Sequence, residues 1–180
     1  MPPPCSLRLA TLDEIPALNR LIAASVRILH APYYSHAQRE SAIGSVFGVD
    51  TQLILDGTYI AARSGEALAG CGGWSKRGTV FGGDHGPARQ DTLLDPVRDP
   101  ARIRAFFIHP DFVRRGIGAQ ILRACEDAAA TDGFSRFELA ATLAGEPFFR
   151  AHGYVAAGPF EVPLPDGQSL TVVRMYKQAV

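Results

Sequence analysis

The residues best suited to chemistry lie at positions 114–119, where two arginines precede a spaced pair of glycines in the order Arg-Arg-Gly-Ile-Gly-Ala. They follow an apolar run, residues 103–109, that predicts a buried strand, and Gly116 begins an amphipathic segment that predicts a helix. Such a turn points successive backbone N–H groups outward, beside the positive end of the helix dipole. Because Gly116 and Gly118 have no Cβ, an anion can approach the backbone closely. The spacing therefore predicts a phosphate or pyrophosphate site.

The charge pattern supports an anion at this turn. Residues 102–123 contain Arg102, Arg104, Arg114, Arg115 and Arg123 with Asp111 as the one acidic residue, whereas the whole chain has 18 basic and 18 acidic residues. The balanced total gives no indication of a nucleic-acid partner. The sequence contains neither a GxxxxGK[ST] motif nor a GxGxxG motif with an acidic ribose ligand. A small nucleotide-binding protein that uses the same turn remains an alternative.

The elements around the turn predict an α/β (α+β) fold, with helices flanking a mixed sheet. The unit at residues 103–141 is a strand, a helix and a strand, which favours a parallel pair with a right-handed crossover. Residues 78–101 are a long irregular segment, which we expect to cap or contact something. Strands are predicted at residues 6–10, 58–63, 67–76, 103–109, 137–141, 154–164 and 169–177. The first helix is predicted to begin at a capping box of Thr11 and Glu14 or, alternatively, at Asp13, and its apolar face continues to Leu29. Further helices are predicted at residues 35–47, 116–132 and 147–152.

The composition predicts a single domain over residues 6–180, preceded by a disordered lead-in at residues 1–5. Apolar residues make up 47% of the 180 residues and charged residues 20%, an ordinary globular balance. The three cysteines form no CxxC pair, and no His or Cys spacing suggests a metal site. With no apolar run long enough to span a membrane and no signal peptide, we expect a cytoplasmic protein without a membrane partner.

Two segments resemble the GCN5-related N-acetyltransferase family. Residues 106–119, Phe-Phe-Ile-His-Pro-Asp-Phe-Val-Arg-Arg-Gly-Ile-Gly-Ala, resemble the family's motif A, and residues 148–154 resemble its late helix and following strand. The order of elements matches as well. The resemblance implies a single-domain mixed sheet that is splayed at its centre, with acetyl-CoA between the fourth and fifth strands. It further implies an acyl-CoA-dependent N-acetyltransferase, in which a small-molecule or peptide amine attacks the thioester directly.

The resemblance also assigns roles to individual residues. The backbone of Phe106, Phe107 and Ile108 would pair with the pantetheine arm, and an N–H near Ile108 would polarise the thioester carbonyl. Glu138 resembles the general base of some members, with a solvent-facing strand carboxylate as the alternative. Thr142, Tyr33 and Tyr34 would contact the acceptor, with packing between helices as the alternative for both tyrosines. The amides that would hold the pyrophosphate are those of Arg114, Arg115, Gly116, Ile117, Gly118 and Ala119.

Two positions depart from the family pattern. Val113 replaces the usual Gln or Arg, although its backbone amide is retained. Phe149 occupies the place of the Tyr that often protonates the departing thiolate, and a phenyl ring cannot donate a proton. A non-catalytic acyl-CoA-binding module of the same fold is therefore a second reading. Asp84 and His85 are the next candidates for a base, and the edge of the C-terminal hairpin could form a homodimer.

Overall fold

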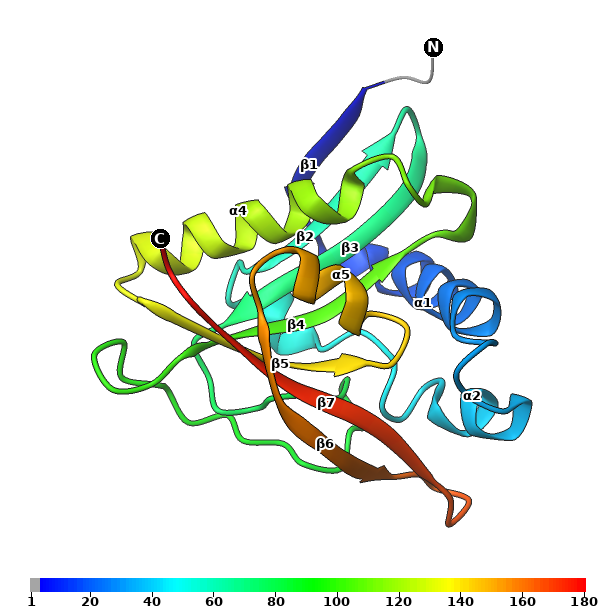
Figure 1. The fold of residues 1–180 in the computed structure, drawn as a ribbon. Coiled ribbons are helices and arrows are strands. Elements are labelled where there is room, and N and C mark those ends of the chain that lie inside the picture. The colour runs from blue at the N-terminus through cyan, green and yellow to red at the C-terminus, as the bar shows by residue number, and fades with distance from the viewer. Residues whose placement is uncertain (1–3) are drawn as a thin grey trace.

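The computed structural model describes residues 4–180, which build one seven-stranded sheet in the order β1-β2-β3-β4-β5-β7-β6 (Figure 1). Among the described strands, β4 and β5 form the one parallel pair, and all other neighbours are antiparallel. The predicted mixed sheet is therefore confirmed. The strands are β1 (Cys5–Leu9), β2 (Tyr59–Ser64), β3 (Ala67–Ser75), β4 (Ala101–Ile108), β5 (Arg136–Thr142), β6 (Val155–Pro163) and β7 (Ser169–Gln178).

The sheet is open at its centre, as the resemblance implied. β4 and β5 pair only at Ala101 with Phe137 and at Arg102 with Glu138, within the described chain. Beyond Arg102 the two strands separate, so the side of β4 that faces β5 has no strand partner along residues 103–108. An unpaired strand side of this kind can accept an extended ligand.

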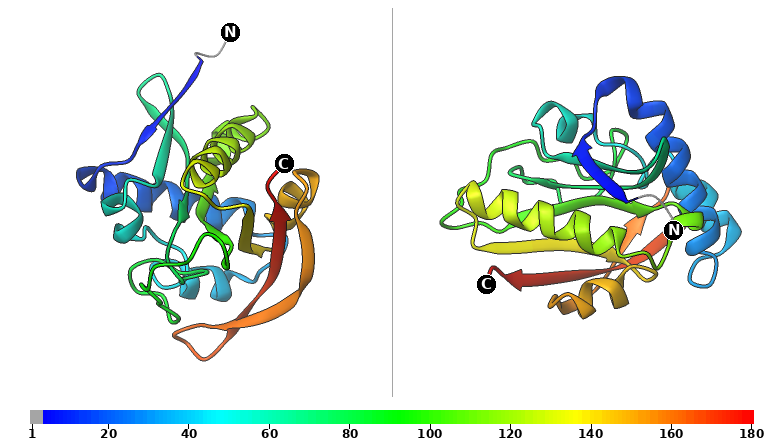
Figure 2. Two further views of the ribbon diagram at one scale, coloured as in Figure 1. Left: turned by 90° about the vertical axis from the view of Figure 1, so that its left-hand side faces the viewer. Right: turned by 90° about the horizontal axis from the view of Figure 1, so that it is seen from above.

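Helices cover both faces of the sheet (Figure 2). α1 (Ile15–Leu29) packs Leu18, Ile22 and Val26 into a core with Tyr59 and Ala61 of β2. α4 (Ile117–Thr131) packs its apolar side into a second core that includes Ala62 of β2 and Ala69 of β3. Neighbouring strand residues point to opposite faces, so β2 contributes to both cores. The remaining helices are α2 (His36–Ala42), α3 (Thr51–Leu55) and α5 (Glu146–Ala151), with 3-10 turns at Leu12–Glu14 and Pro110–Phe112.

One predicted helix is too long, and a second helix was missed. The helix expected over residues 35–47 begins after Ser35, whose hydroxyl accepts the Gln38 N–H at 3.1 Å, but it ends at Ala42. Gly44 has φ +84° and the Ser45 hydroxyl donates to the Ser41 carbonyl at 2.8 Å, so the chain leaves the helical path there. The missed helix is α3, which has only five residues and is capped by the Asp50 carboxylate.

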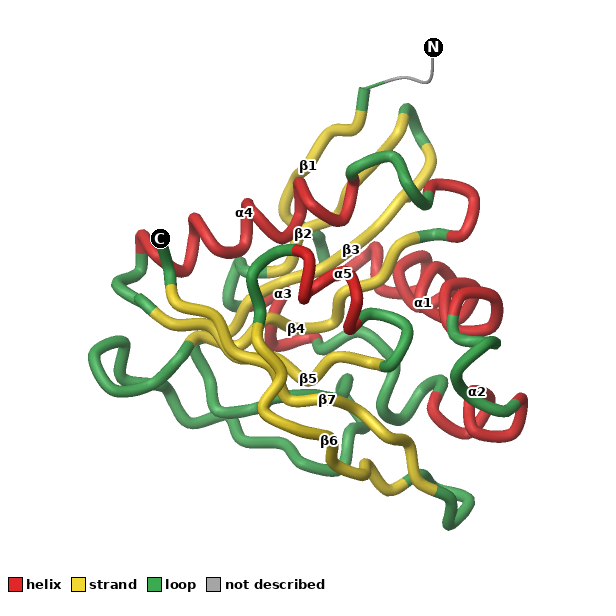
Figure 3. Tube along the Cα trace, viewed as in Figure 1, coloured by secondary structure: helices red, strands yellow, loops and turns green. Residues whose placement is uncertain are grey.

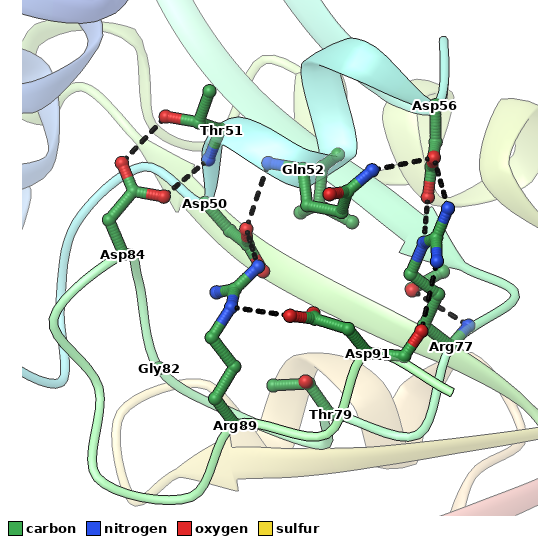
Figure 4. A network of polar contacts seen from close by, with 12 residues as sticks. Asp50, Thr51, Gln52, Asp56, Arg77, Thr79, Gly82, Asp84, Arg89 and Asp91 are labelled. Atoms are coloured by element: carbon green, nitrogen blue, oxygen red, sulfur yellow. Dashed lines mark hydrogen bonds and ion pairs between the residues drawn. The ribbon is translucent and has the colours of Figure 1, made fainter. Parts of the chain in front are cut away.

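The segment between β3 and β4 is long and largely irregular, as predicted (Figure 3). It folds back on itself, with Thr79 N–H donating to the Gln90 carbonyl at 2.9 Å and Leu94 N–H to the Lys76 carbonyl at 2.8 Å. Ion pairs fix it to α3, including one between Arg77 and Asp56 at 2.7 Å (Figure 4). The loop therefore has a defined path beneath the sheet.

The first strand begins one residue earlier than expected. Cys5 pairs with Ser64, so it belongs to β1 and not to a disordered lead-in. Pro4 is exposed and lies in no helix or strand, and residues 1–3 of that predicted lead-in lie outside the described residues. None of the helices in residues 4–180 is both long and apolar enough to cross a membrane. β6 lies at one edge of the sheet, and the homodimer suggested there stays a prediction.

Candidate functional site

A cavity of about 900 Å³ passes through the opening between β4 and β5. Its walls come from both strands, from Ile103 to Ile108 and from Leu139 to Thr142, and from elements on both faces of the sheet. We call the part on the α4 and α5 face the turn half, and the part on the α1 face the His30 half. A molecule that occupied both halves would pass from one face of the sheet to the other between β4 and β5.

The turn half is built around the start of α4. It is lined by Phe106 and Ile108 of β4, by Gly116 and Gly118, and by α5. Arg114 and Gly116 both have positive φ, +61° and +76°, which folds the chain tightly ahead of the helix. Gln120 N–H donates to the Gly116 carbonyl at 3.1 Å, whereas the amides of the first helical residues have no carbonyl of the helix before them. These free amides can hold an anion.

Close packing leaves little room for a side chain at Gly118 and at two glycines of β3, whereas a Cβ on Gly116 would meet nothing within 4 Å. A Cβ on Gly118 would lie 3.2 Å from the Phe148 ring of α5. A Cβ on Gly72 of β3 would lie within 2.4 Å of the Phe106 ring, and one on Gly70 within 2.8 Å of Ile108. Gly70 and Gly72 therefore make room for the two side chains that line the turn half, whereas at Gly73 the backbone of Thr58 lies 2.7 Å from where a Cβ would be.

A bulge in β4 changes which way its side chains point. The register with β3 shifts between the pairs Cys71–Phe107 and Gly73–Arg104, and Ala105 has φ +50°. The Tyr59 hydroxyl donates to the Ala105 carbonyl at 2.9 Å, which holds the bulge from the α1 face. Ala105 and Phe107 consequently pack on the α1 face, whereas Phe106 packs on the α4 face. The bulge thus shifts the alternation by one residue, so that Phe106 and Ile108 share the α4 face with Ile103 while Ala105 and Phe107 turn to the α1 face.

The His30 half is almost entirely apolar. His30 follows the last residue of α1 and is 6% exposed, with its ring 5.3 Å from Phe47 edge-on and 6.4 Å from Phe107 in a stacked arrangement, measured between centroids. Its Nδ1 is buried and has no hydrogen-bond partner. Burial lowers the pKa of His30 to about 4, and the positive charge of Arg39 adds to this effect. The ring is therefore neutral near pH 7.

A buried ion pair holds the loop side of the His30 half. Arg104 of β4 pairs with Asp50 at 2.9 Å, and both side chains are 2% exposed. The same guanidinium donates to the carbonyls of Thr79 and Gly82, which flank the lining residues Val80 and Phe81. Asp50 also pairs with Arg89 at 2.9 Å, and Asp84 accepts from Thr51 (Figure 4). The expectation that residues 78–101 contact something is met here, since they wall the cavity.

Most of the residues predicted for the cofactor line the turn half or the opening. They are Phe106, Phe107, Ile108, Arg114, Gly116, Ile117, Gly118 and Ala119. Arg115 is not among the lining residues, and its guanidinium lies over the Phe112 ring, 5.0 Å from the centroid. Phe107 lines the cavity, but its side chain packs on the α1 face.

The predicted acceptor residues separate into two groups. Tyr33 and Thr142 line the cavity, and Tyr33 is 47% exposed. Tyr34 does not line it. The Tyr34 hydroxyl donates to the Thr171 carbonyl at 2.6 Å and accepts the Leu143 N–H at 2.9 Å, so it ties α1 to β5 and β7. Burial raises the pKa of Tyr34 to about 12. The packing alternative therefore describes Tyr34 better than substrate contact.

Glu138 lies outside the cavity. It faces away from the α4 core, as the strand alternation requires, and is 4% exposed. Its carboxylate accepts from Arg102 of β4 and lies 3.3 Å from the Arg174 guanidinium and 3.4 Å from the Tyr176 hydroxyl of β7. The two strands still pair at this position. Neither the solvent-facing alternative nor a position at the opening matches this placement, and the predicted role as base has no support from the geometry.

Phe149 lines the cavity, as expected for the position of the missing acid. Its ring is 7% exposed and packs against Phe106, Phe148 and Tyr154 at centroid distances of 5.1–5.7 Å. The hydroxyl of Tyr154 donates to Glu126 at 2.8 Å. Tyr154 is not among the cavity-lining residues, so it does not replace the absent phenol.

Sequence reasoning missed His30, Phe47 and Arg104 as site residues. Their spacing in the chain carries no signal, because they meet only through the packing of α1, the segment after α2, and β4. The one usable hint was the length of the loop at residues 78–101. Within residues 4–180, no group of three or more His, Cys, Asp or Glu side chains is arranged to hold a metal ion.

Comparison with known proteins identifies the fold family. The family model of the acetyltransferase (GNAT) domain matches residues 94–163, which include β4, the glycine turn, α4, β5 and α5. A search of curated proteins finds no match. A GCN5-related N-acetyltransferase from Rhodopseudomonas palustris superposes with a TM-score of 0.74 at 22% identity, covering 99% of this chain and 98% of that one.

Other structures with a similar fold contain coenzyme A or acetyl-CoA. PaiA N-acetyltransferase from Thermoplasma acidophilum, in complex with coenzyme A, has a TM-score of 0.67 at 14% identity over 97% of this chain and 99% of that one. YncA from Salmonella typhimurium, a putative acetyltransferase with its cofactor acetyl-CoA, has a TM-score of 0.62 at 14% identity over 98% and 95%. The resemblance to the GCN5-related N-acetyltransferases is thus confirmed, and this chain has their fold.

Proposed function

We propose that this protein is an acyl-CoA-dependent N-acyltransferase that transfers an acetyl group from acetyl-CoA to a primary amine. The observation that carries the proposal is the single cavity that crosses the sheet at the β4–β5 opening, with the glycine turn in one half. The acetyltransferase domain match over residues 94–163 and the CoA-bound structures of similar fold support the choice of cofactor.

The cofactor would lie in the turn half. The free amides at residues 114–119 and the start of α4 suit the pyrophosphate. The side of β4 facing the opening has no strand partner beyond Arg102, so the backbone of residues 106–108 is available to the pantetheine arm. An N–H near Ile108 would then donate to the thioester carbonyl and stabilise the charge that develops on its oxygen.

The amine would enter from the His30 half and meet the thioester in the opening. Its nitrogen forms a bond to the carbonyl carbon, the carbon–sulfur bond breaks, and the thiolate leaves. The proton lost by the amine balances the proton gained by the thiolate. Because Phe149 cannot donate, we infer that the thiolate leaves without help from α5, which is feasible for a good leaving group.

The proposal is tested by mixing the protein with acetyl-CoA and a panel of primary amines and following the release of free thiol. We expect thiol release that depends on both the amine and the protein, together with CoA binding measured by calorimetry. Failure to bind CoA would contradict the proposal at its first step.

A second candidate function is acyl-CoA binding without turnover. Two observations favour it: Phe149 has no proton to give, and Glu138 is engaged by Arg102 and Arg174 away from the cavity. Tight CoA binding without thiol release for any amine would select this function over the first.

A further inference from the structure

The His30 half has a charge composition that restricts what it can bind. Among the residues described, no Asp, Glu or Lys lines the cavity, and the lining arginines are Arg104 and Arg114. Arg114 belongs to the glycine turn. Arg104 donates three of its five N–H groups, to Asp50 and to the carbonyls of Thr79 and Gly82, and its charge is balanced by the Asp50 carboxylate. The His30 half therefore has no free cation for a carboxylate and no free anion for an ammonium group.

Apolar side chains form most of its wall, and its other polar side chains, such as Ser25 and Tyr33, carry hydroxyls and no charge. The apolar residues come from α1, the segment after α2, the loop, β4, β6 and β7, and include Leu29, Phe47, Phe81, Phe107, Val162 and Val172. A charged group placed among them would lose its hydration without a compensating partner, which costs several kcal/mol. An apolar group would gain from burial there.

His30 is a buried polar side chain that lines this half and has an unpartnered ring nitrogen. Nδ1 is inaccessible and unpartnered, while His30 as a whole lines the cavity, which leaves Nε2 as the nitrogen that can reach a ligand. The ring is fixed by Phe47 and Phe107. Since the lone pair of an attacking amine must stay free, a nearby imidazole helps most when it accepts an N–H from that amine.

We propose that the His30 half binds a primary amine with an apolar body and no second charged group, and that Nε2 of His30 accepts a hydrogen bond from its NH₂ group. This inference rests on the proposed function, because the bound amine is taken to be the acyl acceptor. It excludes amino acids with a free carboxylate and diamines as good acceptors. The ring is neutral near pH 7 because burial lowers its pKa, and it accepts at Nε2 in the tautomer that carries the ring proton on Nδ1.

The experiment compares amines that differ by one charge. 2-Phenylethylamine is paired with phenylalanine, which adds a carboxylate, and pentylamine with 1,5-diaminopentane, which adds an ammonium group. We expect kcat/KM with acetyl-CoA to be about 100-fold higher or more for the monoamine of each pair. Equal use of the charged partner in either pair would overturn the inference.

A variant series tests His30 itself. His30→Leu should lower kcat/KM for 2-phenylethylamine about tenfold, the effect of one hydrogen bond, and His30→Gln should restore part of it. His36→Leu is the matched control, because His36 is exposed at the start of α2 and does not line the cavity. CoA affinity should be the same in all three variants. A folded His30→Leu protein with unchanged kcat/KM would remove His30 from acceptor binding.

Binding measurements separate this inference from the proposed function. The same amine pairs are titrated by calorimetry into the protein saturated with CoA. Preferential binding of the monoamines without thiol release would contradict the proposed transfer but support the apolar acceptor site. Thiol release without such a preference would support the transfer and overturn the acceptor class.

Discussion

The two halves of the cavity are put together differently. The turn half takes most of its wall from one continuous stretch, residues 106–119, with α5 laid against it. The His30 half takes its wall from the end of α1, residues 46–48, the loop at residues 80–82, β4, and the β6–β7 hairpin. The first depends on local backbone geometry, and the second on long-range packing. The turn half should therefore be most sensitive to substitution of the residues that line it. The His30 half should be most sensitive to substitution of the residues that hold its wall segments in place.

The largest effect is expected from a support of the His30 half. Arg104→Met leaves the Asp50 carboxylate buried with one of its two arginine partners and frees the carbonyls of Thr79 and Gly82. Removal of one partner of a buried pair costs about 3 kcal/mol or more of unfolding free energy. Urea unfolding measures this loss. KM for the amine should rise while CoA affinity is retained.

Arg123→Met is the control for this change, since Arg123 is 86% exposed on α4. Its unfolding free energy should stay within about 0.5 kcal/mol of the parent. If Arg104→Met were as stable as Arg123→Met, the loop would not depend on the buried pair, and the contrast between the two halves would weaken.

The next effect is a pH dependence of stability from His30. Its pKa falls from 6.5 in the unfolded chain to about 4 when buried, so between these values the unfolded state binds a proton that the folded state does not. Stability is therefore full above pH 6.5 and declines as the pH falls to 4, by about 3 kcal/mol. Thermal or urea unfolding at several pH values records this decline.

His30→Leu should lack the decline between pH 6.5 and 4. A separate loss at lower pH should remain, because burial of Glu14 is outweighed by hydrogen bonds from Arg8 and Arg63, which lower its pKa from 4.5 to about 2. Identical pH curves for parent and variant would show that His30 titrates normally in the folded state.

The turn half is tested by Gly118→Val. The added side chain would meet the Phe148 ring and fill the space in front of the free amides. CoA affinity should fall about 100-fold or more, and the unfolding free energy should fall by about 1–3 kcal/mol because the Phe148 ring must shift. Calorimetry with CoA measures the loss, and Ala130→Val, exposed near the far end of the same helix, is the matched control. Unchanged CoA binding by a folded Gly118→Val protein would refute the pyrophosphate assignment.

The smallest effect is expected on kcat, from a substitution at Phe149, which lies where the two halves of the cavity meet. Phe149→Tyr places a phenol at the edge of the opening, and general acid catalysis should raise kcat by up to about tenfold, less than a group in its evolved position provides. Steady-state kinetics with 2-phenylethylamine measures it, and an unchanged CoA affinity serves as the internal control. No gain would indicate that thiolate departure does not limit the rate.

The sequence predicted the turn half of the cavity better than the His30 half. The glycine turn is specified by neighbouring residues, and the structure places Gly116, Gly118 and Ile108 together on the cavity wall as expected. The sequence could not decide between the alternatives for Tyr34 and Glu138 because their partners are remote: the Tyr34 hydroxyl bonds to the Thr171 carbonyl, and Glu138 pairs with Arg102. No local pattern reports such contacts.

Charge counting along the chain failed for a related reason. Arg102 and Arg104 were included in the positive excess near the turn, yet the fold gives each a carboxylate partner from elsewhere, Glu138 and Asp50. Arg114 and Arg115 are the ones that stay exposed beside the turn. Charges counted along the sequence therefore describe the electrostatics of a turn only after the residues that form ion pairs with distant parts of the chain are left out of the count.

The short junction between β4 and β5 has a mechanical consequence. Two residue pairs and the Arg102–Glu138 ion pair join the strands at one end of a wedge. From Arg102 to Ile108 the chain runs about 20 Å, so turning β5 by about 3° about the junction moves the far end of the opening by about 1 Å. A small rotation at the junction thus produces a large change in the separation of β4 and β5 at the far end of the opening. The pairing of Arg102 with Glu138 therefore affects the width of the opening, although neither residue lines the cavity.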